Sequence, residues 1–307
     1  MEENLYPTSI NSVAIYSIKD LEKLSGIKAH TIRIWEQRYD IVEPGRTNTN
    51  IRYYTDQDLK LILNIALLNR NGIKISKIAK MGNQEILEKV AAISEVNLEN
   101  DMQLDALTLS MIEMDEYKFD RIIATNIQQL GFEKTMIEVI YPFLDKLGLL
   151  WFTGSINPVQ ENFMTYLVRQ KIIAAIDSIP MTLGLNVPKF LIYLPVGESQ
   201  ELSLLFMHYL LKSRRFKVIY VGKNIHVADI EDACRIHKPD YIYTIISETF
   251  VKSPLKEYVA TLTNTFPDTQ LLLSGYQVLT QNIEEEEQVK ILKSLEDTIA
   301  FIDQICL

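Results

Sequence analysis

The 307-residue sequence predicts a multidomain α and α/β protein, with a winged helix-turn-helix, then a helical bundle, then a flavodoxin-like doubly wound parallel sheet. Three observations predict this order. Short helical segments around one polar loop come first, helical periodicity without a convincing strand follows, and apolar runs then alternate with helical segments. We expect the three domains at residues 1–82, 83–182 and 183–307.

The first unit begins with two short helices. Ser17 precedes "IKDLEKLSG", and Asp20 three residues later gives the pattern of a capping box. Gly26 ends this helix. In the second helix, "KAHTIRIWEQRY", Ile32 and Trp35 are spaced for one buried face. Two short helices joined by a tight turn form a helix-turn-helix.

A polar loop and a third helix complete this unit. Pro44 and Gly45 turn the chain into the loop, which returns through "IRYY" as a small hairpin or wing. Thr55 caps "DQDLKLILNIALLNRNG". An apolar stripe on this helix predicts a buried face, formed by Leu59, Ile62, Leu63 and Ala66.

Residues 83–182 are predicted to be helical. Five segments carry helical periodicity, with breaks at Gly131, Gly154 and Asn157–Pro158, and we expect a bundle of four or five helices. From residue 183 the runs "FLIYLP", "FKVIYVG", "DYIYTIIS" and "QLLLSG" alternate with helices at about 199–214, 226–237, 252–264 and 293–305. This alternation predicts a parallel, doubly wound sheet. We interpret "EEEE" (284–287) as a solvated loop or helix start.

Composition narrows the classes of function. No apolar run reaches the roughly 18 residues that a membrane helix needs, and Glu2 and Glu3 do not fit a basic targeting segment, so we expect a cytoplasmic protein with no membrane partner. Two cysteines, Cys234 and Cys306, cannot form a disulfide framework. We interpret Cys234 and its neighbour His237 as core and surface residues, and we expect no metal.

Charge is distributed unevenly along the chain. The whole sequence carries a net charge of −9, but residues 1–80 hold 12 basic and 9 acidic side chains, so the remainder carries −12. A mildly basic end on an acidic body can present a local DNA-binding face while the rest repels DNA.

Polar and basic side chains gather where a recognition helix needs them, at the start of the second helix. Such residues reach base edges and phosphates in the major groove, and a wing adds bonds to the backbone. The candidate DNA-binding residues are Lys28, His30, Thr31 and Arg33 on the helix, and Arg46, Asn48, Asn50, Arg52 and Tyr53 in the wing.

Residues 16–81 resemble the winged helix-turn-helix of the MerR family of transcriptional regulators, through "TIRIWEQRY", the Arg-containing wing and "RYYTDQDL" in order. The resemblance implies DNA contacts from the candidate helix residues and, in the wing, from Arg46, Asn50, Arg52 and Tyr53. We assign Trp35 and Tyr54 to packing. MerR-like regulators bind two-fold operators, so the resemblance implies a homo-oligomer, a dimer or a tetramer, on double-stranded operator DNA.

The domain order as a whole resembles the cobalamin-responsive, light-sensing branch of that family. That branch implies a bundle that caps the corrin and a sheet domain that supplies a histidine below it. The family's lower loop runs acidic, any residue, histidine, whereas this chain reads Glu198, Ser199, Gln200. A carboxamide is a poor cobalt donor compared with a neutral imidazole, and Glu198 has no imidazole to orient. His208 and His226 lie outside the loop.

Other positions depart from the branch's pattern in the same direction. The glycine that leaves room for the nucleotide tail is Ser203, and the paired glycines after the fourth strand are Ser274 and Gly275. In the bundle's capping signature the histidine is replaced. The full set of candidate cofactor positions is Trp151, Glu161, Asn162, Glu198, Gln200, Ser203, Ser247, Ser274 and Gly275.

Three functions remain in competition. The first is a MerR-family DNA-binding regulator that has lost cobalamin and responds to a protein partner or another small ligand. The second is an adenosylcobalamin-dependent light-sensing repressor, favoured by Trp151 and Glu161. The third is a corrinoid enzyme module, which the DNA-binding head disfavours. No nucleophile elbow or phosphate loop is recognisable, and we expect no enzyme activity.

Overall fold

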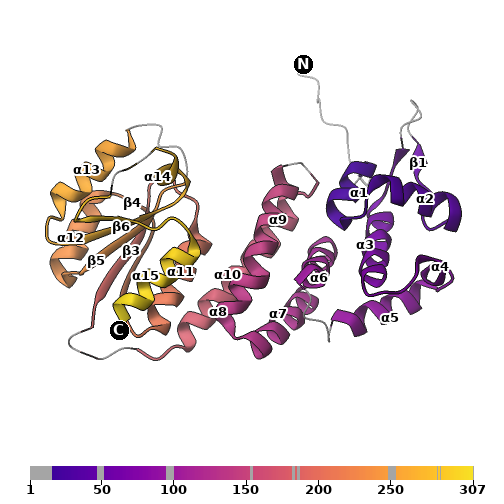
Figure 1. Cartoon of the computed structure of the whole chain (residues 1–307), viewed down its shortest axis with the longest axis horizontal. Coiled ribbons are helices and arrows are strands. Elements are labelled where there is room, and N and C mark those ends of the chain that lie inside the picture. The colour runs from indigo at the N-terminus through magenta and orange to yellow at the C-terminus, as the bar shows by residue number, and fades with distance from the viewer. Residues whose placement is uncertain are drawn as a thin grey trace, which may run out of the picture. The chain divides into compact units, whose positions relative to one another are not determined.

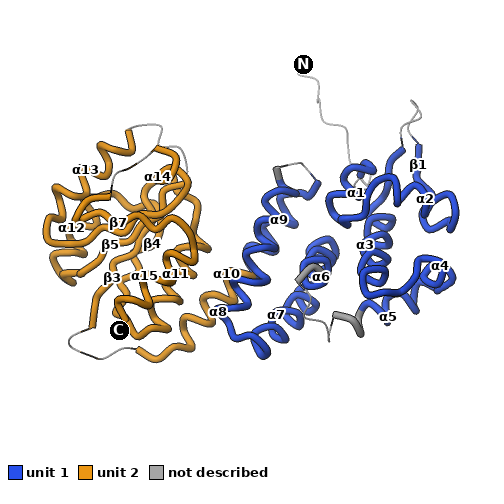
Figure 2. Tube along the Cα trace, in the orientation of Figure 1, with its two compact units in different colours: residues 1–167 blue, residues 168–307 orange. Residues whose placement is uncertain are grey.

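The computed structural model places the elements in two compact units, residues 1–167 and 168–307 (Figures 1 and 2). It describes residues 16–46, 52–94, 100–152, 155–181, 184, 187–247, 254–281, 283 and 285–306. The division between the units falls inside helix α10 (Pro158–Ser178). The three-domain boundaries stay a prediction.

The first unit opens with the expected helix-turn-helix. Helices α1 (Ile18–Ser25) and α2 (Ala29–Tyr39) precede a hairpin of β1 (Gly45–Arg46) and β2 (Arg52–Tyr53), and α3 (Asp56–Arg70) follows. The predicted capping box of Ser17 with Asp20 is present. Thr55 caps α3 as predicted, and its partner in a second capping box is Asp58. Each capping box satisfies two backbone N–H groups that a helix start leaves without partners.

Helix α3 forms the core of this part. Its residues Ile62 to Leu68 are all buried, and the predicted stripe lies within this buried surface. Helix α2 buries Ile32 and Trp35, and Tyr54 is fully buried beside the wing. The assignment of Trp35 and Tyr54 to packing is therefore confirmed. Tyr16 pairs with Tyr54 through two backbone hydrogen bonds of 2.8 and 2.9 Å, which join the start of α1 to the wing.

Helices continue to residue 178, as expected. They are α4 (Ile75–Ile78), α5 (Asn83–Ser94), α6 (Asn100–Glu113), α7 (Glu116–Leu130), α8 (Phe132–Thr135), the π-helical turn η1 (Met136–Ile140), α9 (Tyr141–Phe152) and α10. Helix α5 packs on α3 and α6, whereas α6 also packs on α7, η1 and α9. The described residues 83–94, 100–152 and 155–178 contain no strand.

The π-helical turn has a local cause in the sequence. Proline at position 142 lacks the N–H that would bond four residues back, and its ring crowds that carbonyl. The N–H of Tyr141 instead bonds the carbonyl of Met136, five residues back. A wider turn before proline lets the helix continue through it.

The second unit is a five-stranded parallel sheet in the order β4-β3-β5-β6-β7, so the flavodoxin-like expectation is confirmed. Its strands are β3 (Lys189–Pro195), β4 (Lys217–Ile225), β5 (Tyr241–Ile245), β6 (Gln270–Ser274) and β7 (Val289–Ile291). Its helices are α11 (Glu201–Ser213), α12 (Val227–His237), α13 (Leu255–Thr265), α14 (Tyr276–Thr280) and α15 (Leu295–Cys306). Strand β7 and helix α14 were not predicted.

Helices cover both faces of this sheet (Figure 1). Helices α12 and α13 pack on the face that carries Leu191, Tyr193, Ile242 and Leu271. Because side chains alternate along a strand, Phe190, Ile192 and Tyr243 lie on the opposite face, on the side of α11 and α15. Among the helices of the described residues, none is long and apolar enough to span a membrane.

Candidate nucleic-acid interface and ligand-binding edge

The turn between α1 and α2 is held by contacts from α1 itself. Gly26 adopts a left-handed conformation (φ 68°), and the Ser25 hydroxyl accepts a hydrogen bond from the Ile27 N–H at 3.2 Å. The Glu22 carboxylate accepts the Ala29 N–H at 3.1 Å and pairs with Lys28 at 3.0 Å. These bonds lower the pKa of Glu22 and cap the start of α2.

Helix α2 turns its candidate DNA-binding side chains outward. Lys28, His30 and Arg33 are exposed, and Thr31 is half-buried. The Lys28 side chain is 81% exposed although it pairs with Glu22. A surface ion pair of this kind contributes little stability, so Lys28 can exchange Glu22 for a phosphate at small cost.

The wing places its candidate residues differently. Arg46 is exposed, whereas Arg52 and Tyr53 are half-buried; Asn48 and Asn50 lie outside the described residues. The Tyr53 ring lies over Gly45, where an added Cβ would meet ring atom Cε2 at 2.6 Å. Arg52 Nε lies 3.8 Å from Glu36 Oε2. Arg52 and Tyr53 thus stabilise the hairpin and are also partly exposed on it.

Glu36 joins the wing to helix α2. The Tyr54 hydroxyl donates to Glu36 Oε1 at 2.5 Å, and the Glu36 side chain is only 7% exposed. Burial, followed by the hydrogen bond to Glu36, raises the pKa of Tyr54. A neutral tyrosine therefore remains the donor to this carboxylate over the whole physiological pH range.

In the second unit, Glu198 ties together two loops at the carboxyl edge of the sheet. It follows β3, is 4% exposed, and accepts the Ser247 N–H at 2.7 Å on Oε2 and the Ser199 N–H at 3.0 Å on Oε1. Ser247 follows β5, whose carboxyl end lies beside that of β3. Glu198 thus has backbone partners in the position where the family resemblance implies a role in orienting an imidazole.

Gln200 stands at the N-cap of α11 and is half-buried, and Ser203 lies in the first turn. The hydroxyl groups of Ser274 on β6 and Tyr243 on β5 form a hydrogen bond of 2.9 Å. Gly275 has φ 107°, and a Cβ there would lie 2.6 Å from the Ile246 carbonyl carbon. The sheet edge therefore brings Glu198, Ser247 and Gly275 into one set of connected loops, and its close packing needs glycine at 275.

The bundle residues lie on α9 and α10 in the first unit. Trp151 is 48% exposed, and Asn162 is exposed. Glu161 Oε1 accepts a hydrogen bond from the Thr165 hydroxyl at 2.9 Å. Large apolar side chains on the same two helices are also exposed, namely Leu149, Val159 and Tyr166. Exposed large apolar side chains on these two helices are candidates for a contact with a ligand or partner.

Histidines and cysteines form no metal site in the part of the chain that the structure describes. His208 stacks on Tyr220, with ring centroids 5.3 Å apart, and burial lowers its pKa to about 4. His226 is the N-cap of α12. Cys234 packs against the sheet core, and burial raises the pKa of its thiol to about 11.

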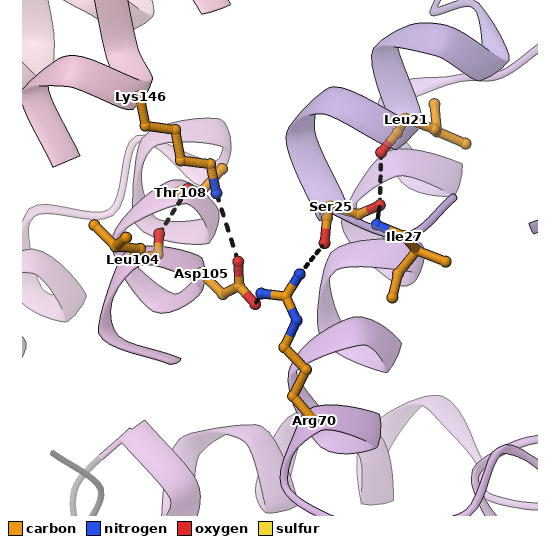
Figure 3. A network of polar contacts seen from close by, with 8 residues as sticks. All are labelled: Leu21, Ser25, Ile27, Arg70, Leu104, Asp105, Thr108 and Lys146. Atoms are coloured by element: carbon orange, nitrogen blue, oxygen red, sulfur yellow. Dashed lines mark hydrogen bonds and ion pairs between the residues drawn. The ribbon is translucent and has the colours of Figure 1, made fainter. Parts of the chain in front are cut away.

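Sequence reasoning missed a polar network between the first unit's two parts. Arg70 at the end of α3 pairs with Asp105 of α6, and Lys146 of α9 lies 3.5 Å from the same carboxylate (Figure 3). The signal was present in "MQLDALTL", where one carboxylate interrupts an apolar stretch. A buried carboxylate needs a cation opposite it, although the sequence does not say which one.

Two family models match parts of the chain, the MerR HTH family regulatory protein over residues 16–85 and the B12 binding domain over residues 103–175. The HTH-type transcriptional repressor CarH of Myxococcus xanthus is 26% identical over 233 residues, covering 74% of this chain and 77% of the relative. The repressor CarA of the same organism is 23% identical, covering 91% and 90%.

The chain thus carries a MerR-type HTH domain at residues 16–85, followed by a region that matches the B12 binding domain.

The region that matches the B12 binding domain runs from α6 into α10, and the sheet follows it along the chain. The monomethylamine corrinoid protein of Methanosarcina barkeri shares the fold, with a TM-score of 0.51, 11% identity, and coverage of 67% of this chain and 100% of that one. At this identity the likeness concerns the fold alone.

Proposed function

We propose that this regulator binds a two-fold operator as a homo-oligomer, with α2 in the major groove and the wing against the backbone. The observation that carries the proposal is the division of α2: Lys28, His30 and Arg33 are exposed at its start while Ile32 and Trp35 are buried. A helix held by its apolar face and presenting basic residues near its N-terminus can reach base edges.

The proposal is tested by selecting sites from a random duplex library and measuring affinity by fluorescence anisotropy at several salt concentrations. Arg33→Ala removes an exposed cation near the start of α2, and Arg38→Ala removes an exposed one from its last turn. We expect Arg33→Ala to weaken binding about tenfold and Arg38→Ala by less than about threefold. Equal effects on every duplex would show that the start of α2 does not read the sequence.

Oligomerisation follows from the size of the DNA-binding surface. One winged domain neutralises few phosphates, each of which contributes a slope of about 0.9 in log affinity against log salt. A two-fold assembly doubles these contacts. Light scattering coupled to size-exclusion chromatography gives the mass of the assembly, and a monomer at working concentration, with and without operator, contradicts this part of the proposal.

We propose further that the sheet domain does not hold cobalamin through a histidine. Gln200 occupies the ligand position, and the carboxylate of Glu198 is committed to the N–H groups of Ser199 and Ser247. Gly275 packs directly on the Ile246 backbone, which gives this glycine a structural role independent of any ligand. The residues present therefore do not fit a histidine-ligated corrinoid, and an unidentified ligand or protein partner supplies the signal.

One observation favours the alternative of an adenosylcobalamin-responsive repressor, namely the B12-binding match over residues 103–175, which includes Trp151 and Glu161. The two are separated by incubation with adenosylcobalamin and methylcobalamin in the dark, gel filtration, and visible absorption. A colourless protein supports loss of the cofactor. A stoichiometric corrinoid spectrum contradicts it and leads next to oligomer mass before and after illumination.

We propose that the chain is not an enzyme and acts in the cytoplasm, where operator DNA is accessible. The relatives named above are transcriptional repressors, and the DNA-binding head accounts for the exposed basic residues. Turnover of a methylated corrinoid by the purified protein would contradict this assignment in favour of a corrinoid enzyme module.

A further inference from the structure

Helix α1, which precedes the recognition helix, contacts the bundle at its N-terminal end. The Ser155 hydroxyl donates to Asp20 Oδ1 at 3.0 Å, and Ser155 is 2% exposed in the segment between α9 and α10. Asp20 also completes the capping box of α1. The first turn of α1 is therefore fixed against the segment that follows α9.

The C-terminal end of α1 is held through an arginine. Arg70 Nη2 donates to the Ser25 carbonyl at 2.8 Å, and its Nη1 pairs with Asp105 Oδ2 on α6. Lys146 Nζ on α9 lies 3.5 Å from Asp105 Oδ1 (Figure 3). One carboxylate is thus shared by a cation of the DNA-binding part and a cation of the bundle.

Asp105 depends on these cations. The residue is 3% exposed, and burial raises its pKa even though Lys146 and Arg70 both act to lower it. Removing either partner leaves a buried carboxyl with less compensation, which favours uptake of a proton or a rearrangement. The network is therefore sensitive to small movements of the helices that carry it.

Arg70 also lies directly beneath the turn into α2. A Cβ added to Gly26 would clash with Arg70 Nη2, so the guanidinium is in contact with the turn backbone. The Ser25 hydroxyl accepts the Ile27 N–H at 3.2 Å and donates to the Leu21 carbonyl at 2.6 Å (Figure 3). The position of the guanidinium thus influences the direction in which the chain enters α2.

We infer that Arg70 and Asp105 are positioning residues for the recognition helix, and that Lys146 couples the position of α2 to the packing of α9 on α6. The inference deepens the proposed function and rests on it for its effect on DNA. Helix α9 also carries the exposed Trp151, so a ligand or partner bound there acts on the helix whose Lys146 pairs with Asp105 of α6. This gives the bundle a physical route to the DNA-binding surface.

The chain offers a matched control on the same helix. Glu113 of α6 pairs with Lys118 of α7, with side-chain exposures of 20% and 23%. Glu113→Gln removes a paired carboxylate from α6 as Asp105→Asn does, but one that pairs with α7 and has no part in the network of Arg70, Asp105 and Lys146. Lys146→Met tests the coupling while it leaves the pair of Arg70 and Asp105 in place.

The experiment is hydrogen–deuterium exchange of the full chain, read by mass spectrometry in peptides covering residues 27–33. We expect Asp105→Asn to raise the exchange rate there about fivefold or more, Lys146→Met about twofold, and Glu113→Gln less than twofold. Peptides that cover α7 serve as an internal reference, because general unfolding of the chain would raise their exchange rate too.

Operator affinity is measured in parallel, and Asp105→Asn is expected to weaken it about tenfold, against less than threefold for Glu113→Gln. Equal exchange of residues 27–33 in Asp105→Asn and Glu113→Gln overturns the inference, whether or not the wild type binds DNA. Changed exchange with unchanged affinity overturns the role in DNA binding. A wild type that selects no duplex overturns the proposed function, while the exchange result still decides the positioning role.

Discussion

Gly275→Ala is the substitution whose cost the structure defines most closely. Gly275 has φ 107°, and the new Cβ would lie 2.6 Å from the carbonyl carbon and 2.7 Å from the nitrogen of Ile246. A residue with a side chain in such a conformation costs on the order of 1–3 kcal/mol, and a forced shift of packed backbone adds about 1–3 kcal/mol. We expect the second unit to lose about 2–6 kcal/mol in its free energy of unfolding.

Gly197 separates the cost of the backbone conformation from the cost of the backbone contact, and Gly148 gives a substitution with neither cost. Gly197 has φ 89° with no atom within 4 Å of its built Cβ, so Gly197→Ala should cost only the conformational part, about 1 kcal/mol. Gly148 lies within α9 with free space, so Gly148→Ala should stabilise the first unit by about 0.5–1 kcal/mol.

The assay is pulse proteolysis across a urea gradient, which follows the fragments of each unit separately because unfolding of two units need not be two-state. The expected order of stability of the second unit is wild type, then Gly197→Ala, then Gly275→Ala. A Gly275→Ala protein as stable as Gly197→Ala would refute the reasoning, since it would show that the Ile246 backbone yields without cost.

Three further changes have definite expected outcomes. Tyr54→Phe removes the donor to the buried Glu36 carboxylate and should cost about 1–3 kcal/mol in thermal unfolding of the first unit; an unchanged melting temperature counts against that bond. His208 has its pKa lowered to about 4, so the unfolded chain binds more protons between pH 4 and 6.5, and its stability contribution is full above pH 6.5 and lost as pH falls to 4. His208→Phe should reduce the fall in the free energy of unfolding over that window, measured in urea, by about 1 kcal/mol after allowance for solvent screening, and an unaltered pH dependence contradicts the assignment. A thiol reagent at pH 8 should label the exposed Cys306 about a hundredfold faster than Cys234, whose thiol has its pKa raised to about 11; equal rates in mass spectrometry would exclude the burial described.

Local signals in the sequence predicted the first unit well. Ser17 and Thr55 each cap a helix through a partner three residues further along the chain. Because capping contacts are this local, they can be predicted without knowledge of the rest of the fold. The buried stripe of α3 follows from spacing alone. The alternation of apolar runs and helices likewise predicted the parallel sheet.

Short elements escaped prediction because their stability comes from neighbours. Strand β7 has three residues, and its ladder with β6 supplies the hydrogen bonds that identify it. Helix α14 has five residues and follows Gly275 as its N-cap, whose close contact with Ile246 fixes the turn. Neither pattern is long enough to show a period in the sequence.

The partners of the candidate site residues depend on tertiary packing. Glu198 was expected to lack an imidazole, but its bond to the Ser247 N–H joins residues 49 positions apart, and no spacing rule predicts it. Ser274 stands where the family pattern has a glycine, and its hydroxyl bond to Tyr243 joins residues 31 positions apart. The pair of Arg70 and Asp105 joins two helices through charges that the sequence shows only as isolated residues.

The most direct test of the central claim is methylation protection of the selected operator by dimethyl sulfate. The account predicts protected guanine N7 positions in two half-sites related by a two-fold axis, and loss of that protection in Arg33→Ala but not in Arg38→Ala. Protection spread evenly along the duplex, or unchanged in Arg33→Ala, would contradict recognition through the start of α2.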